Sequence, residues 1–80
     1  MKQAILTTVI SVEKQSLDSV VVRLQSDALQ DAGEIVSTGL NLERTKKRSG
    51  SRLEVTCKGD PKAKPGDKVP VIVRPEKRGK

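Results

Sequence analysis

The chain has 80 residues, lacks Phe, Trp and Tyr, and carries 16 Lys and Arg against 10 Asp and Glu, a net charge of +6. This length accommodates one small domain with a thin aliphatic core and excludes a second domain. Because the chain has no His and a single Cys, the sequence also excludes an intramolecular disulfide, a His/Cys zinc site and a His-based triad.

The charge is distributed unevenly along the chain. Residues 1–43 contain three Lys and Arg against six acids, whereas residues 44–80 contain thirteen against four. This separation creates a directed positive field, which attracts polyanions such as nucleic acid, an anionic membrane surface or an acidic protein. The N-terminal apolar run is too short and too polar for a membrane span or a signal peptide, so we expect a cytoplasmic protein.

The first two expected elements are strands. Residues 3–13 form a long strand whose two faces are both partly apolar, which is typical of a strand that bends around a small barrel. A turn-rich segment at 14–19 follows. Residues 20–24 then alternate, with Arg23 directed outward, and predict a second strand that forms a hairpin with the first.

A short helical turn is expected next, at residues 26–33. Asp27 has the position of its N-terminal cap, and Gly33 can close it in the left-handed conformation. Residues 34–43 predict a third strand, in which Gly39 marks a bulge or a bend.

The segment RTKKRSGSR, residues 44–52, places five cationic side chains in nine positions. We expect residues 44–50 to be a basic loop in which Gly50 is a hinge that orders on contact with a ligand. Residues 51–59 alternate cleanly and predict a fourth strand, with Cys57 directed into the core.

The remaining segments are a loop, a strand and a tail. Residues 60–68 contain two prolines and no large apolar side chain, which predicts a loop whose aspartates are turn residues. Residues 69–75 predict a fifth strand, and Pro70, which lacks an amide hydrogen, indicates an edge strand or a bulge. The expected organisation is therefore one domain over residues 1–75 and a flexible basic tail at 76–80.

The fold class that follows is mainly β, a small five-stranded antiparallel barrel or roll with one short helical turn. Strand number and length make it OB-like or SH3-like. An OB fold usually has its helix between the third and fourth strands, whereas the helical turn here follows the second, so the SH3-like barrel remains open.

The basic segments predict a nucleic-acid-binding surface. If successive strands are antiparallel, loop 44–50 and the C-terminal tail lie at one pole and loop 58–68 lies at the other. Lacking aromatic rings on which bases stack, the chain is expected to grip the phosphate backbone of DNA or RNA with little sequence preference. The residues expected to do so are Arg44, Lys46, Lys47, Arg48, Arg52, Lys58, Lys62, Lys64, Arg74, Lys77, Arg78 and Lys80.

The alternative function is a protein-interaction or assembly module. In that case an edge strand, either 69–73 or the long first strand, pairs with a partner sheet while the basic face docks on an acidic surface. The thin core also predicts either a marginally stable monomer or a homo-oligomer. We expect no enzymatic activity, metal, cofactor, small-molecule substrate or membrane association, and the sequence leaves open DNA or RNA and single or double strands.

Overall fold

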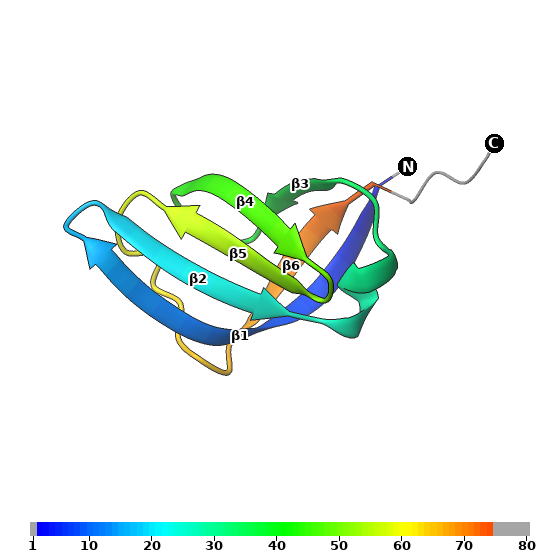
Figure 1. Ribbon diagram of the computed structural model, residues 1–80, viewed down its shortest axis with the longest axis horizontal. Coiled ribbons are helices and arrows are strands. Elements are labelled where there is room, and N and C mark those ends of the chain that lie inside the picture. The colour runs from blue at the N-terminus through cyan, green and yellow to red at the C-terminus, as the bar shows by residue number, and fades with distance from the viewer. Residues whose placement is uncertain (1, 75–80) are drawn as a thin grey trace.

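A computed structural model describes residues 2–74, which form six strands and one 3-10 helix (Figure 1). The strands pair antiparallel in the order β3-β6-β1-β2-β5-β4, and β3 and β4 then face each other, so that the sheet is a nearly closed barrel. The mainly β barrel with one helical turn is thus confirmed. The elements are β1 (Gln3–Ser16), β2 (Ser19–Gln25), η1 (Asp27–Asp31), β3 (Ile35–Thr38), β4 (Glu43–Ser49), β5 (Arg52–Cys57) and β6 (Lys68–Val73).

The expected strand count of five was wrong because the basic segment is itself a strand. β3 ends at Thr38, a turn follows, and β4 then pairs with β5 along its whole length. Ser49 pairs with Arg52, so Gly50 and Ser51 form a two-residue hairpin turn. Gly50 has φ +62°, the left-handed conformation that the first position of such a turn requires. Gly50 is therefore a turn residue in an ordered hairpin and not a hinge in a loop.

The core lies inside the barrel and is aliphatic. Cross-strand register places inner side chains opposite one another, as in the pairs Val22 with Val55 and Leu24 with Leu53. Leu29, from η1, is fully buried with them and covers one end of the barrel. Among the described residues, one polar side chain is buried, that of Thr7. Its hydroxyl donates a hydrogen bond of 2.7 Å to the carbonyl oxygen of Val69. The expected burial of Cys57 is confirmed.

The two faces of β1 differ, although both are partly apolar in sequence. Ile5 and Val9 are buried in the core, whereas Leu6 is 61% exposed and Ile10 is 37% exposed on the outer face. The register with β2 shifts between Val9 and Ser11, which shows a bulge and returns Val12 to the core side. The long first strand thus bends within the barrel wall.

Pro70 does not mark an edge strand, because β6 lies between β3 and β1. The carbonyl oxygen of Pro70 accepts a hydrogen bond of 2.8 Å from the amide of Gly39. In an antiparallel sheet, the N and O atoms of one residue point toward the same neighbouring strand. The nitrogen of Pro70 therefore points toward Gly39, just beyond the end of β3, where no amide hydrogen is needed for the pairing of β3 with β6. A proline is tolerated inside the sheet for this reason, and Gly39 forms the expected bend.

The helical turn is confirmed, but its ends differ from the expectation. The cap is Ser26, whose side chain accepts a hydrogen bond of 3.3 Å from the amide of Ala28. Asp27 is the first residue of η1 instead. The chain leaves η1 through Ala32 in an extended conformation, so Gly33 does not close the helix in the left-handed region.

Candidate functional site

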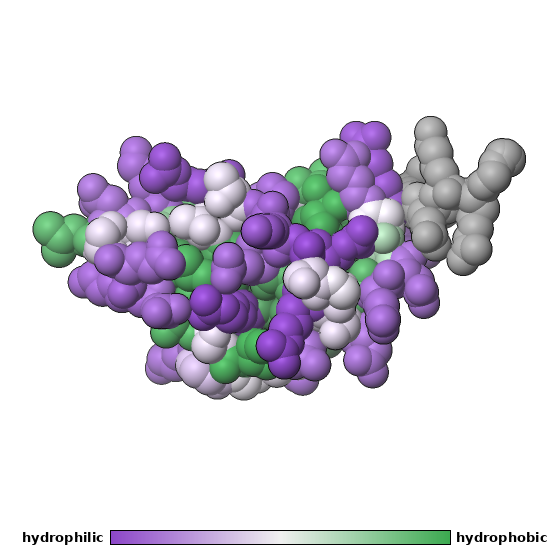
Figure 2. All heavy atoms as spheres, in the orientation of Figure 1, coloured by the Kyte–Doolittle hydropathy of each residue, from purple (hydrophilic) through white to green (hydrophobic). Residues whose placement is uncertain are grey.

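The β4–β5 hairpin concentrates positive charge. Residues 43–58 contain six Lys and Arg residues against two glutamates. The hairpin runs along the barrel, with its turn at the end where η1 and the end of β6 lie (Figure 1). Hydrophilic side chains cover most of the face made by β2, β5 and β4 (Figure 2).

β4 is an edge strand that borders a gap in the barrel. It pairs with β5 on one side, and no strand pairing joins it to β3 within residues 2–74. We call this gap the seam. Positions of β4 that would point into a closed barrel carry polar side chains instead, since Lys46 lies opposite Val55 and Arg48 lies opposite Leu53. Side chains rather than backbone hydrogen bonds therefore hold the seam.

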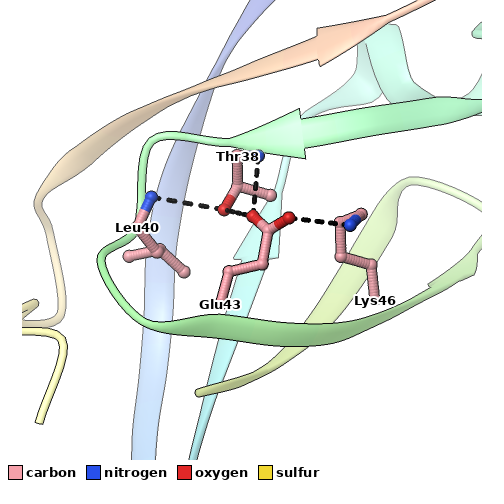
Figure 3. Close-up of polar contacts among 4 residues, drawn as sticks. All are labelled: Thr38, Leu40, Glu43 and Lys46. Atoms are coloured by element: carbon pink, nitrogen blue, oxygen red, sulfur yellow. Dashed lines mark hydrogen bonds and ion pairs between the residues drawn. The ribbon is translucent and has the colours of Figure 1, made fainter. Parts of the chain in front are cut away.

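Glu43 forms the first of these links (Figure 3). Its carboxylate accepts hydrogen bonds from the backbone amide of Thr38, at 2.8 Å, and from the Thr38 hydroxyl. The other carboxylate oxygen lies 2.7 Å from Nζ of Lys46, in a pair whose side chains are only 17% and 21% exposed. Burial by itself raises the pKa of Glu43, but the hydrogen bonds from Lys46 and Thr38 outweigh it and lower the pKa below its ordinary value.

Arg48 forms the second link, toward the segment after η1. Its Nη1 donates to the carbonyl oxygens of Ala32 at 2.6 Å and Gly33 at 2.8 Å, and more weakly to Leu29 at 3.3 Å. These carbonyls belong to the end of η1 and the segment that enters β3. The amide of Gly33 in turn donates a hydrogen bond to the backbone carbonyl oxygen of Arg74. The guanidinium is therefore held in place without a carboxylate.

Most cations of the hairpin have no acidic partner. Among the described residues, Lys46 is the one cation of segment 44–52 with a carboxylate within 4.0 Å. Outside the hairpin, Arg23 pairs with Glu13 and Glu54, and Arg74 pairs with Glu34, whereas the lysines of the described residues there make no ion pair. The hairpin differs from the rest of the described chain in placing several unpaired cations within one short segment.

Two clefts flank β4. The outer cleft, of about 340 Å³, lies on the face of the sheet, and the seam cleft, of about 470 Å³, lies between β3 and β4. The outer cleft is lined by Arg23, Lys47, Ser49, Arg52, Leu53 and Glu54. The seam cleft is lined by Gly33, Glu34, Ile35, Arg44, Thr45, Lys46 and Arg48.

The predicted binding residues are not gathered at one pole. Because 44–49 is a strand, Arg44 lies at the end of β4 near Lys58, whereas Arg48 lies near Arg74 at the other end. Arg52 is close to Arg48, at the hairpin turn. The prediction that residues 44–50 lie together at one pole was therefore wrong.

The loop cations Lys62 and Lys64 lie between β5 and β6, away from the seam. Their amides donate to Asp60 at 2.8 Å and Asp67 at 2.9 Å, which confirms that these aspartates are turn residues. The predicted tail residues Lys77, Arg78 and Lys80 lie outside the described part of the chain.

Sequence reasoning missed the structural roles of Glu43, Lys46 and Arg48. The alternation in RTKKRS has no apolar member, so hydrophobic periodicity gives no strand signal there. One signal was available: Gly50-Ser51 is a Gly-X pair of the kind that forms a two-residue hairpin turn.

Within residues 2–74 no cluster of three or more metal-ligating side chains occurs, and no helix is long and apolar enough to span a membrane. Burial, and then the negative charge of Glu43, raise the pKa of the Cys57 thiol above its ordinary value, which disfavours the reactive thiolate. Comparison of the chain with protein-family models, curated proteins and solved structures gives no match.

Proposed function

We propose that this protein is a non-enzymatic nucleic-acid-binding protein that contacts the phosphate backbone through the β4–β5 hairpin. The observation that carries this proposal is the group of cations in segment 44–52 that have no carboxylate partner among the described residues, namely Arg44, Lys47, Arg48 and Arg52. Uncompensated cations concentrated on the two sides of one hairpin attract a polyanion, and they release its counterions when it binds.

The mode of binding follows from the absence of aromatic rings. Bases stack on aromatic side chains in many single-strand binders, and that contribution is missing here. Contacts to phosphates position a protein on nucleic acid but carry little sequence information. We therefore expect binding that tolerates any sequence and weakens steeply as salt rises.

The experiment compares two triple charge reversals. R44E/K47E/R52E reverses three exposed cations of the hairpin, whereas K2E/K14E/K68E makes the same change in net charge at exposed positions outside it. Lys46 and Arg48 stay unchanged because they hold the seam. Binding is measured by anisotropy of labelled single- and double-stranded DNA and RNA across a salt series.

The hairpin triple variant should lose most binding to every oligonucleotide, while the control keeps most of it. Equal losses in the two variants would mean that net charge alone matters, and the hairpin assignment would fail. No binding of the wild-type chain to any of the four probes at low salt would refute the proposed function. Far-UV circular dichroism of each variant establishes that its fold is intact.

A second candidate is edge-strand pairing with a protein partner. The observation in its favour is that β3 and β4 each have one edge without strand pairing within residues 2–74, although the predicted edges in β6 and β1 are internal. Charged side chains on β4 oppose pairing with another strand, as edge cations commonly do. Association that persists at high salt, either with a partner or between copies of this chain, would support this alternative or the predicted homo-oligomer.

A further inference from the structure

The seam cleft is lined on its β4 side by three cations, Arg44, Lys46 and Arg48, together with Thr45. We propose that it binds the sugar-phosphate backbone of a single nucleic-acid strand in an extended conformation. The inference rests on the proposed function and adds the form of nucleic acid and the side of β4 that holds it.

The spacing of Lys46 and Arg48 suits such a ligand. They are alternate residues in the regular part of β4, where such residues are separated by about 6.7 Å, twice the rise per residue. Arg44 lies at the register irregularity between Glu43 and Thr45 and extends the row at the start of the strand. Adjacent phosphates of an extended single strand have a comparable separation. A backbone lying parallel to β4 can therefore meet Arg44, Lys46 and Arg48 with successive phosphates.

Arg48 is the fixed point of this row. Its hydrogen bonds to the protein all come from Nη1, and they are accepted by neutral carbonyl oxygens. A guanidinium has five N–H donors, so the bonds from Nη1 leave other donors for an anion, and its charge is not cancelled. Holding the side chain in advance lowers the entropy lost when a phosphate binds.

The two ends of the row should bind more strongly than its middle. Lys46 already pairs with Glu43 at 2.7 Å, which reduces its net attraction for a phosphate. Arg44 has no carboxylate within 4.0 Å among the described residues. On the opposite wall, Glu34 pairs with Arg74, which reduces its repulsion of the ligand.

The shape of the cleft favours a single strand. It lies between two strand edges, β3 and β4, and is open to solvent along β4. One phosphate backbone can lie along such a cleft, whereas a duplex is too wide to enter it and meets only its rim. Because no aromatic ring is present to hold the bases, they remain outside and sequence is not read.

The test compares two single substitutions on the same strand. R44Q removes a cation from the seam cleft, and K47Q removes one from the outer cleft, with the same change in charge. Each variant is titrated with a labelled single-stranded oligonucleotide and with its duplex. Oligo-glutamate of matched charge serves as a competitor.

We expect the wild-type chain to bind the single strand at least about tenfold more tightly than the duplex. R44Q should lower single-strand affinity about tenfold, as expected for losing one charged hydrogen-bonded contact. It should also flatten the slope of log affinity against log salt by about 0.7, the value for one lost phosphate contact to a single strand. K47Q should change either quantity much less.

Four results would overturn the inference. If K47Q weakens binding as much as R44Q, or if the duplex binds as well as the single strand, the seam is not the site, although the proposed nucleic-acid function survives. If oligo-glutamate competes as well as the oligonucleotide, the seam accepts any extended polyanion, and an acidic peptide becomes the better candidate. If the wild-type chain binds no nucleic acid, the proposed function fails, and this inference fails with it.

Discussion

The carboxylate of Glu43, at the start of β4, accepts hydrogen bonds from both the amide and the hydroxyl of Thr38, at the end of β3. These two residues connect the strands at the ends of the sheet order, which share no ladder. The barrel is thus closed at this point by one side chain. The same arrangement explains why an acid begins a segment that is otherwise cationic.

This link predicts how stability depends on pH. A carboxylate whose pKa is lowered in the folded state stabilises the protein fully above its ordinary pKa of 4.5, and that contribution is lost as pH falls through the lowered value. E43Q, which cannot ionise, should therefore be less stable than the wild type at neutral pH, with the difference shrinking in acid. Urea unfolding at several pH values measures this difference.

The control for E43Q is E34Q, which removes a carboxylate from an exposed ion pair with Arg74. Exposed pairs contribute about 0–1 kcal/mol, so this variant should stay close to the wild type. A constant difference between E43Q and the wild type from neutral to strongly acidic pH would contradict the role assigned to Glu43.

Arg48 should matter for stability as well as for binding. R48M keeps the apolar stem but removes the donor to the carbonyl oxygens of Ala32 and Gly33. We expect a loss of about 1–2 kcal/mol, since these exposed carbonyls can regain part of their hydrogen bonding from water. Thermal unfolding followed by circular dichroism measures the loss.

K47M is the matched control for R48M, because Lys47 is the neighbouring exposed cation and lies on the outer side of β4. Its stability should stay within about 0.5 kcal/mol of the wild type, as for most surface changes. Equal stability of R48M and K47M would show that the Arg48 hydrogen bonds do not hold the seam.

Gly39 should not tolerate a side chain. A Cβ atom at this position would lie 2.9 Å from Cδ and 3.0 Å from Cγ of Pro70, closer than van der Waals contact allows. G39A should therefore destabilise the fold by about 1–3 kcal/mol, the range for overpacked sites. Urea unfolding gives the value, with S37A in the adjoining strand β3 as the control.

A double variant separates the steric cause from a change in backbone entropy. P70A removes Cδ and Cγ of Pro70, which are the two atoms closest to the added Cβ. The destabilisation caused by G39A should therefore be smaller in the P70A background. The carbonyl oxygen of residue 70 would remain 3.3 Å away, which limits the recovery. Strict additivity of the two substitutions would refute the steric explanation.

Gly50 distinguishes a hairpin turn from a flexible hinge. Its φ is +62° and a Cβ would meet nothing within 4 Å, so only backbone conformation opposes substitution. G50A should cost about 1–2 kcal/mol in thermal unfolding, because L-residues disfavour the left-handed region. G50N should cost less, since Asn enters that region more readily. A hinge would accept both substitutions without loss.

The sequence alone determined the elements whose side chains alternate between apolar and polar. Arg23 lies outside and Cys57 inside, as predicted, because burial of one strand face leaves a period of two in the sequence. The short helical turn and the proline-rich loop were also predictable, since capping and turn residues act locally. The composition likewise indicated a thin aliphatic core.

Only the tertiary structure decided the place of segment 44–49. Its strand conformation depends on pairing with β5, and its polar inner face depends on the barrel staying open at the seam. Neither condition leaves a hydrophobic pattern in the sequence. The roles of Lys46 and Arg48 likewise depend on partners in other elements, such as the carbonyl oxygen of Ala32. A count of charges therefore predicted a basic surface, but only the fold showed which of these cations also hold the seam.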